Sequence, residues 1–198
     1  CENNRDERSR YLLVENRKVE NYVDMALYYA RMDAVYKDYM IAETNLQEVA
    51  QQVLLQNKYY LIQSHVKAEV ACPDTVYSDK KWIAFILNQL IQNSVKYGRS
   101  EGTHIQIVTK KTKSGVLLRV KDDGIGIPKE ELPRIFEKGF TGTNGRNRER
   151  STGMGLYLCR KLCDKLNIEI RAESAEGKGT EIILMFPVSD YLTGYRET

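Results

Sequence analysis

The N-terminal part of the chain is one long run of apolar positions near helical spacing. Between residues 9 and about 38 the run includes Leu12, Val19, Val23 and Leu27, and no Gly or Pro interrupts it. Such an apolar face needs a partner, which is typical of one arm of a coiled coil or of a helical hairpin. The alternative is a helix that packs on the domain that follows.

From residue 40 the pattern changes to shorter segments. Alternating or β-branched apolar positions predict strands at 39–44, 65–70, 104–112, 116–122, 168–174 and 180–188. Helical spacing predicts helices at 45–63, 79–97, 129–136 and 154–167. Asn45 and Asp79 have side chains suited to N-caps, which supports the first two of these helix starts. We therefore expect a layer of mixed strands with about three main helices.

The helix expected at 79–97 has two unlike faces. One face is apolar and suits a core, whereas a second stripe carries Gln89, Asn93 and Lys96 among aromatic neighbours that include Tyr97. Two amides and an amine among such neighbours do not form a plainly solvated surface. The stripe is either a helix edge at the rim of the sheet or part of a binding site.

Charge and hydropathy exclude several classes of partner. The 198 residues carry 30 basic and 27 acidic side chains, a formal charge of +3, so no global field directs the chain to nucleic acid or anionic lipid. The longest strongly apolar run, 82–87, is far shorter than the roughly 20 residues of a membrane-spanning helix. The chain begins at Cys1 without Met or a signal-peptide pattern, and we expect a piece of a longer protein whose membrane part lies outside it.

The cysteines and histidines predict no metal site. The four cysteines form no C-x-x-C pair and no zinc spacing with His65 or His104. Cys159 and Cys163 lie one helical turn apart, and we expect small buried side chains there in preference to a metal site. This usage favours a reducing compartment without disulfides.

Two glycine-rich motifs flank a long loop. The segment 122–128, DDGIGIP, follows a strand, but Pro128 and the lack of a third Gly exclude a dinucleotide-binding fingerprint. Taken alone, it predicts a turn. Gly153 and Gly155 open a helix, and the free N–H groups and the dipole of a helix start suit a phosphate.

The loop between these motifs, residues 137–153, is rich in Gly, Asn, Thr and Arg. A loop of that length inside a compact domain is usually a lid or a binding loop. Its Arg146, Arg148 and Arg150 are either a solvated charge run or side chains that reach a phosphate.

Four motifs occur in a fixed order along the chain: NQLIQNSVKY, DDGIGIP, IFEKGF and STGMGL. In that order and at these separations they resemble the N, G1, F and G2 boxes of the ATP-binding domain of bacterial sensor histidine kinases, which share the Bergerat fold with gyrase, the Hsp90 chaperones and MutL. The similarity spans roughly residues 40–188. Segments 11–33 and 78–97 are most similar to the intramembrane-sensing subgroup, which is associated with antimicrobial-peptide and bacitracin responses in Gram-positive bacteria.

The resemblance implies an architecture and a domain boundary. The fold would be α+β, a two-layer α/β sandwich of the Bergerat type with a mixed sheet and about three main helices, preceded by a long helix. Residues 1–39 would be the second helix of a dimerisation and phosphotransfer hairpin, and residues 40–198 the ATP-binding catalytic domain. The implied cofactors are ATP and Mg²⁺.

The resemblance also implies roles for the polar stripe. Asn93 matches the side chain that holds Mg²⁺ between the phosphates, an oxygen ligand for a hard cation. Gln89 stands where hydrolytic relatives place a glutamate as general base, and an amide cannot take a proton, which favours phosphoryl transfer over hydrolysis. Lys96 matches a residue that reaches toward phosphate, and Tyr97 an aromatic that packs on the nucleotide. The expected catalytic residues are Gln89, Asn93 and Lys96.

The resemblance places the adenine at the first glycine motif. Asp122 matches the carboxylate that accepts a hydrogen bond from the adenine amino group, which guanine cannot donate at that position. Thr180 matches a threonine whose hydroxyl supports this contact, and Gly124 and Gly126 would let the backbone approach the nucleotide. Phe136 would pack under the loop. The other expected ATP contacts are Ile127, Phe140, Thr152, Gly153, Met154, Gly155 and Leu156.

The implied function is that of the catalytic portion of a two-component sensor histidine kinase. It would transfer the ATP γ-phosphoryl group to a His absent from this chain, because neither His65 nor His104 lies in a phosphoacceptor motif and both are expected in strands. A response regulator would then receive the phosphate on an Asp. Two alternatives stay open: a nucleotide-dependent binding module without phosphotransfer, and an ATP hydrolase of the gyrase, Hsp90 or MutL kind.

The same resemblance implies the setting of the full-length protein. It would be a homodimer in the bacterial cell membrane, with this portion in the cytoplasm. A peptide transporter would be its membrane partner, and no nucleic acid is expected as a partner.

Overall fold

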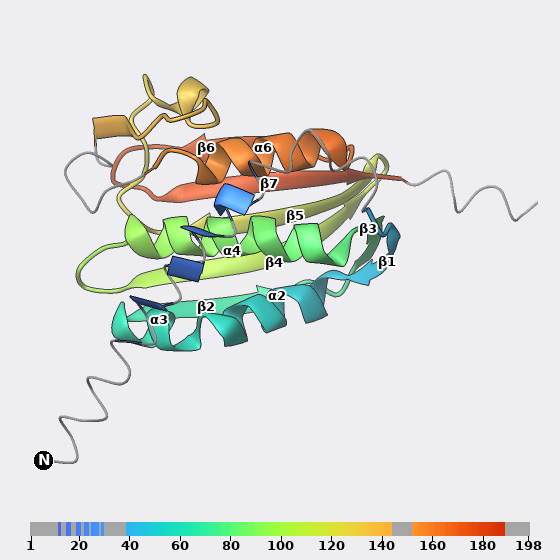
Figure 1. Cartoon of the computed structure of the whole chain (residues 1–198), viewed down its shortest axis with the longest axis horizontal. Coiled ribbons are helices and arrows are strands. Elements are labelled where there is room, and N and C mark those ends of the chain that lie inside the picture. Colours follow the sequence, from blue (N-terminus) through green and yellow to red (C-terminus); the bar gives the residue numbers. More distant parts are fainter. Residues whose placement is uncertain are drawn as a thin grey trace, which may run out of the picture.

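The computed structural model describes residues 39–143 and 152–188, together with separate helical positions between Leu12 and Tyr29 (Figure 1). In chain order the elements are β1 (Ala42–Asn45), α2 (Leu46–Gln56), α3 (Lys58–Gln63), β2 (Val66–Ala71), β3 (Thr75–Ser78), α4 (Lys80–Lys96), β4 (Thr103–Thr112), β5 (Gly115–Asp122), the 3₁₀ helix η2 (Leu132–Arg134), α6 (Gly155–Lys165), β6 (Glu169–Ser174) and β7 (Thr180–Pro187).

A five-stranded mixed sheet forms one layer of the domain. Its order is β2-β4-β5-β7-β6, with β2 parallel to β4 and the other neighbours antiparallel. The β4–β5 and β6–β7 pairs are antiparallel hairpins, built from strands that the alternating patterns predicted. Strands β1 and β3 form a separate antiparallel ribbon.

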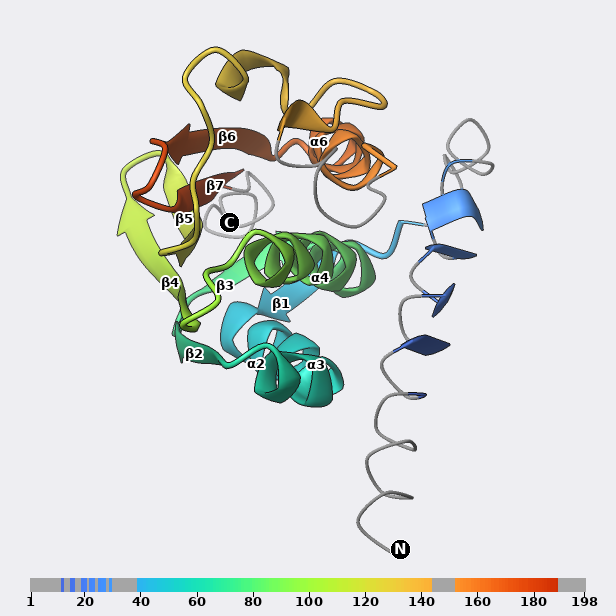
Figure 2. The ribbon, with the colours of Figure 1, turned by 90° about the vertical axis from the view of Figure 1, so that its left-hand side faces the viewer.

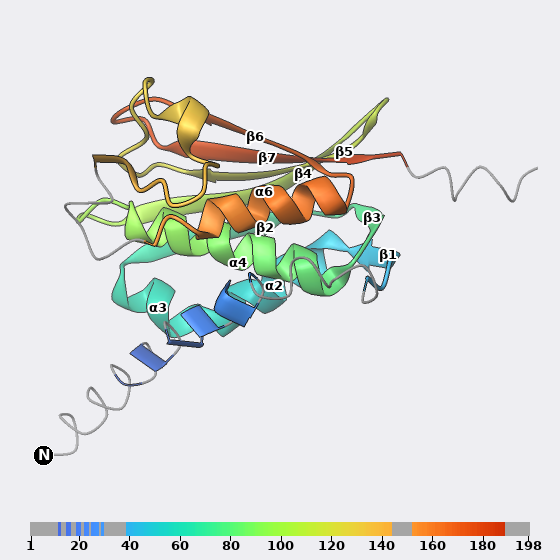
Figure 3. The same cartoon turned by 45° about the horizontal axis from the view of Figure 1, so that its top comes forward.

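Helices α2, α4 and α6 cover one face of the sheet and form the second layer (Figures 2 and 3). Alternate strand residues, such as Ile105 and Ile107 of β4 and Leu118 of β5, are buried beneath them. The apolar face of α4 lies in the middle of this core, where Ile83 and Leu87 are fully buried. The arrangement confirms the expected α+β fold, a two-layer sandwich with a mixed sheet and three main helices.

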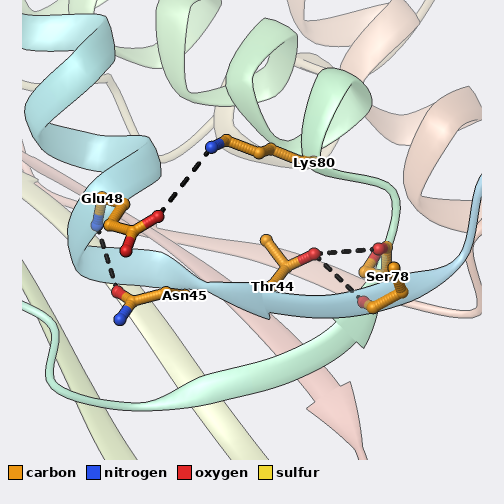
Figure 4. Close-up of polar contacts among 6 residues, drawn as sticks. Thr44, Asn45, Glu48, Ser78 and Lys80 are labelled. Carbon is orange, nitrogen blue, oxygen red and sulfur yellow. Dashed lines mark hydrogen bonds and ion pairs between the residues drawn. The ribbon is translucent and has the colours of Figure 1, made fainter.

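The starts of α2 and α4 are both capped by side chains. Asn45 accepts a hydrogen bond from the Glu48 N–H at 3.1 Å, as its position predicted (Figure 4). Asp79 accepts from the N–H groups of Lys81 at 2.9 Å and Trp82 at 3.3 Å. Each cap satisfies backbone donors that a helix start leaves without intrahelical partners.

The β1–β3 ribbon joins the two capped helix starts (Figure 4). The Thr44 hydroxyl donates to the Ser78 carbonyl oxygen at 3.0 Å. Lys80 lies 3.9 Å from the Glu48 carboxylate, an exposed pair that contributes little to stability. The buried ribbon contact and the caps therefore fix where α4 begins.

We expect Asp79→Ala to lower the free energy of unfolding by about 1–2 kcal/mol, because α4 loses its cap. The same carboxylate accepts from the Met40 N–H at 2.8 Å, so the preceding segment loosens as well. Urea unfolding followed by circular dichroism measures the change. Asp79→Asn, which keeps one acceptor oxygen, is the matched control and should lose less. An unchanged unfolding midpoint in Asp79→Ala would contradict this assignment.

The single helix predicted at 45–63 is wrong. The structure divides it at Asn57, which ends α2 and precedes α3. The buried Asn57 amide donates to the Val53 carbonyl and to Asn88 Oδ1, both at 2.8 Å. The break between α2 and α3 therefore accompanies the hydrogen bonds of the buried Asn57 amide, one of which reaches a residue of α4 that lies far away in the sequence.

The short helix expected near 129–136 is the 3₁₀ helix η2, which is limited to Leu132–Arg134 because Pro133 has no N–H with which to continue a helical hydrogen-bond ladder. One further local prediction is wrong. His65 lies in the turn before β2, with a φ of 53°, and not in a strand. His104 does lie in a strand, β4, and its Nε2 is 3.2 Å from the Glu69 carboxylate.

Most of the long helix predicted at 9–38 lies outside the described residues. Its described positions are helical. Met25 is half-buried, and the other large apolar side chains there are exposed: Leu12, Val19, Tyr22, Val23, Leu27 and Tyr29. Lys138 Nζ lies 4.6 Å from the centre of the Tyr29 ring. The domain boundary at residue 39 stays a prediction. No helix among the described residues is both long and apolar enough to cross a bilayer.

Candidate functional site

A pocket opens between α4, the segments that follow β5, and the sheet. Its lining residues are Leu90, Asn93, Ser94, Tyr97, Val120, Asp122, Gly126, Ile127, Pro128, Glu131, Ile135, Phe140, Thr141, Gly142, Leu156, Thr180 and Ile182. Apolar walls with a few convergent polar groups are typical of a small-ligand site. The expected site residues that meet here are Asn93, Tyr97, Asp122, Gly126, Ile127, Phe140, Leu156 and Thr180.

Asp122 is the buried carboxylate of this pocket, with only 9% of the residue exposed. Its Oδ2 accepts a hydrogen bond from the Ser94 hydroxyl at 2.8 Å. Its Oδ1 accepts from the N–H groups of Gly124 at 3.0 Å and Thr180 at 3.1 Å. A carboxylate offers about four acceptor positions, so one remains for a ligand.

Burial raises the pKa of Asp122 above its ordinary value of 3.8. The three hydrogen bonds oppose the rise, and the nearby charge of Asp123 adds to it. The native state therefore binds this proton more tightly than the unfolded chain does. The stabilisation is complete below the unfolded pKa and is lost as pH rises through the higher folded pKa.

We therefore expect Asp122→Asn to raise the unfolding temperature of the ligand-free protein at neutral pH, because a neutral side chain avoids burying the charge. At about pH 4 the difference from the wild type should be smaller, since part of the native carboxyl is then protonated. Differential scanning calorimetry at the two pH values measures both differences. A lower unfolding temperature for Asp122→Asn at neutral pH would show that the hydrogen bonds outweigh burial.

The glycine-rich turn after β5 is fixed against the end of α4. The Ile125 N–H donates to the Tyr97 carbonyl oxygen at 3.0 Å. A Cβ at Gly124 would lie only 2.6 Å from the same oxygen. Gly124 is thus required by the contact between the turn and α4.

Gly126 is required by the next contact of the same turn. It has a φ of 71°, and a Cβ there would overlap the Ala175 carbonyl oxygen. The Gly177 N–H donates to the Ile125 carbonyl at 2.7 Å, which closes the contact with the β6–β7 turn. Both glycines therefore permit close approach of protein backbone, and their expected approach to a nucleotide stays a prediction.

Thr180 reaches Asp122 through its backbone N–H. Its hydroxyl oxygen lies 3.0 Å from the Ser174 hydroxyl oxygen on the neighbouring strand. Thr180 lines the pocket. A contact between its hydroxyl group and a ligand stays a prediction.

The polar stripe of α4 is divided by the structure. One face of α4 lines the pocket with residues at positions i, i+3, i+4 and i+7, which are Leu90, Asn93, Ser94 and Tyr97. The expected residues Gln89 and Lys96 lie at one edge of this face and are not among the lining residues; Lys96 is half-buried in the last turn of α4.

Gln89 packs against the start of α6. The residue is 5% exposed, and a Cβ at Gly155 would lie 2.7 Å from its Oε1. Within residues 39–143 and 152–188, no group accepts a hydrogen bond from its Nε2. An unpaired buried amide N–H is costly, and it marks this contact as a place where an acceptor is expected to bind.

The start of α6 follows the second glycine motif. Gly153 has a φ of 66°, and its carbonyl oxygen accepts from the Gly139 N–H at 3.1 Å. The Thr152 hydroxyl accepts from the Met154 N–H at 3.3 Å. Of the residues expected here, Leu156 lines the pocket, and the lining does not include Thr152, Gly153, Met154 or Gly155. Arg146, Arg148 and Arg150 lie outside the described residues.

Ser94 and Glu131 are two of the lining residues that the sequence analysis missed. Ser94 is a small polar residue on the buried side of a helix, and such a position was the only signal that it carried. Glu131 Oε1 accepts from the N–H and the hydroxyl of Thr143, each at 2.8 Å, which fixes the neighbouring wall. Charged residues are common in short connecting segments, so Glu131 gave no signal.

Asn93 is a residue of the pocket wall that could hold a Mg²⁺ ion jointly with phosphate oxygens. Asn93 contributes a half-buried amide to the pocket wall, and Mg²⁺ in nucleotide sites takes few protein oxygens together with phosphates and water. No group of three or more His, Cys, Asp or Glu side chains in the described part of the chain could hold a metal alone. A metal here would therefore depend on a phosphate-bearing ligand.

The described cysteines are buried free thiols, as expected for Cys159 and Cys163. Burial raises the pKa of Cys72 to about 11 and that of Cys163 to about 12. Burial also raises the pKa of Cys159 well above its ordinary value. These thiols are inert packing groups and no part of the site.

Sequence comparison matches residues 78–190, more than half of the chain, to the family described as histidine kinase-, DNA gyrase B-, and HSP90-like ATPase. Sensor histidine kinase YxdK of Bacillus subtilis (strain 168) is 34% identical over 174 residues, which cover 87% of this chain and 54% of that protein. Sensor protein kinase GraS of Staphylococcus aureus (strain JH1) is 36% identical over 189 residues, 93% of this chain and 53% of that protein. The chain thus spans about half the length of these curated relatives.

Structure comparison finds the same architecture in solved histidine kinases. The nucleotide-free catalytic domain of histidine kinase ThkA superposes with a TM-score of 0.64 at 26% identity, over 75% of this chain and 97% of that one. ThkA in complex with the response regulator protein TrrA gives a TM-score of 0.66 at 24% identity, over 89% of this chain and 49% of that one. With the matched motifs and the pocket that they line, these likenesses show that the chain belongs to the histidine kinase-, DNA gyrase B- and HSP90-like ATPases and has the fold of a histidine kinase catalytic domain.

Proposed function

We propose that this chain is the ATP-binding catalytic portion of a two-component sensor histidine kinase. The observation that carries the proposal is the buried Asp122 carboxylate, which keeps one acceptor position inside an apolar pocket. That position suits the amino group of adenine, whereas the 6-oxygen of guanine would meet the carboxylate as a second acceptor. Tyr97 and Ile182 supply wall surface for the faces of the purine.

The phosphates are proposed to lie between α4 and the start of α6. The first N–H groups of α6 carry the positive end of the helix dipole, and no side chain of the described residues caps them. Asn93 would hold Mg²⁺ together with phosphate oxygens, and the ion would neutralise charge on the transferred group. Gln89, whose Oε1 faces Gly155, has an unpaired Nε2 that is proposed as a donor for a phosphate oxygen, and Lys96 is proposed to approach the same end.

The proposed reaction is transfer in preference to hydrolysis. The amide of Gln89 is no base at neutral pH, so no general base precedes Asn93 on α4. Attack then depends on a nucleophile placed in line by another segment, a His outside this chain. Its imidazole nitrogen forms a bond to the γ-phosphorus as the bond to the ADP oxygen breaks, and catalysis comes from positioning and charge neutralisation.

The proposed partners follow from the family. The phosphate passes to an Asp of a response regulator, a proposal supported by the capture of ThkA with TrrA. The exposed apolar side chains between Leu12 and Tyr29 are proposed to pair in a homodimer of the full-length protein. We place this portion on the cytoplasmic side of a bacterial cell-membrane protein with a peptide transporter as membrane partner, following the likeness to YxdK and GraS.

The test is labelling with γ-³²P-ATP and Mg²⁺ of a chain extended to include the missing hairpin helix. We expect acid-labile, base-stable phosphohistidine in the extended chain, none in the 198-residue chain, and a rate at least about 100-fold lower in extended Asn93→Ala. ATP binding without any label would favour the binding-module alternative. Rapid release of inorganic phosphate by the 198-residue chain would favour the hydrolase.

A further inference from the structure

Ser174, the last residue of β6, joins three parts of the pocket through one hydroxyl group. Its Oγ accepts a hydrogen bond from the Ile127 N–H at 2.9 Å, which fixes the end of the glycine-rich turn. It donates to the Gly179 carbonyl oxygen at 2.7 Å. It also lies 3.0 Å from Thr180 Oγ1. Ser174 itself is half-buried and does not line the pocket.

The partners of this cluster determine which hydroxyl group donates each hydrogen bond. A carbonyl oxygen only accepts and a backbone N–H only donates, so the single Ser174 proton is used on Gly179. The contact with Thr180 therefore uses the Thr180 proton. Thr180 Oγ1 is left with lone pairs and no proton to offer a ligand.

Asp122, which also lines the pocket, likewise offers a ligand an acceptor and no proton. Asp122 is already the acceptor for three donors, from Ser94, Gly124 and Thr180, and its remaining position also accepts. The Ser94 hydroxyl also lines the pocket, and its proton is used on Asp122. With Thr180 turned toward Ser174, none of these three groups has a proton for a ligand. A ligand that fits must bring donors to Asp122 and Thr180.

We infer that Ser174 is a positioning residue for base selectivity, which acts by holding the Thr180 hydroxyl as an acceptor. This inference rests on the proposed ATP site and deepens it. A 6-amino purine presents donors to Asp122 and Thr180, whereas a 6-oxo purine presents an acceptor and is rejected. Without the Ser174 oxygen, the Thr180 hydroxyl can rotate and donate to a 6-oxo group.

The experiment is calorimetric titration of the 198-residue chain with ADP and with inosine diphosphate, a 6-oxo probe. We expect the wild type to prefer ADP, and Ser174→Ala to reduce the ratio of the two affinities by about tenfold, the effect of one hydrogen bond of about 1.4 kcal/mol. Ser174→Thr keeps the hydroxyl and should restore most of the ratio. A ratio unchanged in folded Ser174→Ala would overturn the inference.

Thr180→Val provides a second test, first alone, which does not depend on the folding of Ser174→Ala, and then combined with it. It removes the acceptor itself, so its ratio should fall, and adding Ser174→Ala to it should change the ratio no further. An additive second loss would show that Ser174 acts elsewhere and would overturn the inference. If the wild type binds neither nucleotide, the proposed function fails; if it binds ADP with a selectivity that ignores Ser174, only this inference fails.

Discussion

Asp122→Ala is expected to weaken the binding of ADP by about 100-fold or more. The change removes the acceptor for the adenine amino group, and a hydrogen bond to a charged group contributes about 1.5–3 kcal/mol. It also leaves the Ser94 hydroxyl and the N–H groups of Gly124 and Thr180 without their buried acceptor. The loss of these bonds should loosen the turn that forms one wall of the pocket.

Equilibrium dialysis with radiolabelled ADP measures the loss, with circular dichroism to verify folding. Asp123→Asn is the matched control, because Asp123 is exposed and its Oδ1 accepts from the His104 N–H at 2.7 Å, away from the pocket lining. We expect this control to bind within about threefold of the wild type, as for an exposed position away from the pocket. Equal losses in the two variants would assign the effect to charge in general and remove Asp122 from its proposed role.

Gly126→Ala is expected to damage both the fold near the pocket and the binding of ADP. The residue has a φ of 71°, in the left-handed region, and the added carbon would overlap the Ala175 carbonyl oxygen. Left-handed backbone costs a non-glycine residue about 1–2 kcal/mol, and overpacking adds about 1–3 kcal/mol. The turn must move, so we expect both lower stability and loss of ADP binding.

Gly177→Ala separates the two contributions to this loss. Gly177 has a φ of 75° but nothing lies within 4 Å of where its Cβ would be, so only the backbone strain remains. Urea unfolding should show a loss of about 1–2 kcal/mol in Gly177→Ala and about 2–5 kcal/mol in Gly126→Ala. Equal losses in the two variants would mean that the contact with Ala175 relaxes without cost.

Much of the fold could be predicted because its signals are local. The N-caps at Asn45 and Asp79 and the alternation in β4 and β5 each need only a few neighbouring residues. The break at Asn57 could not be predicted in this way. It depends on a hydrogen bond to Asn88, which only the packing of α2 on α4 brings near.

The candidate site shows the same division between local and tertiary information. The order of motifs predicted that Asn93, Tyr97 and Asp122 would meet, and they line one pocket. Helical spacing alone could not tell which edge of the polar stripe faces that pocket, and Gln89 falls outside the lining. Ser94 joins Asp122 across the helix–sheet contact, and no local pattern marks such a pair.

The most direct test of the ATP site is calorimetric titration of the 198-residue chain with a non-hydrolysable ATP analogue, with and without Mg²⁺, beside the matching GTP analogue. The account predicts micromolar to millimolar binding of the ATP analogue that Mg²⁺ strengthens, with the GTP analogue bound at least about tenfold more weakly. The Mg²⁺ effect should disappear in Asn93→Ala while adenine preference remains. A folded wild-type chain that binds neither analogue, or that binds both equally, would contradict the site at Asp122 and Asn93.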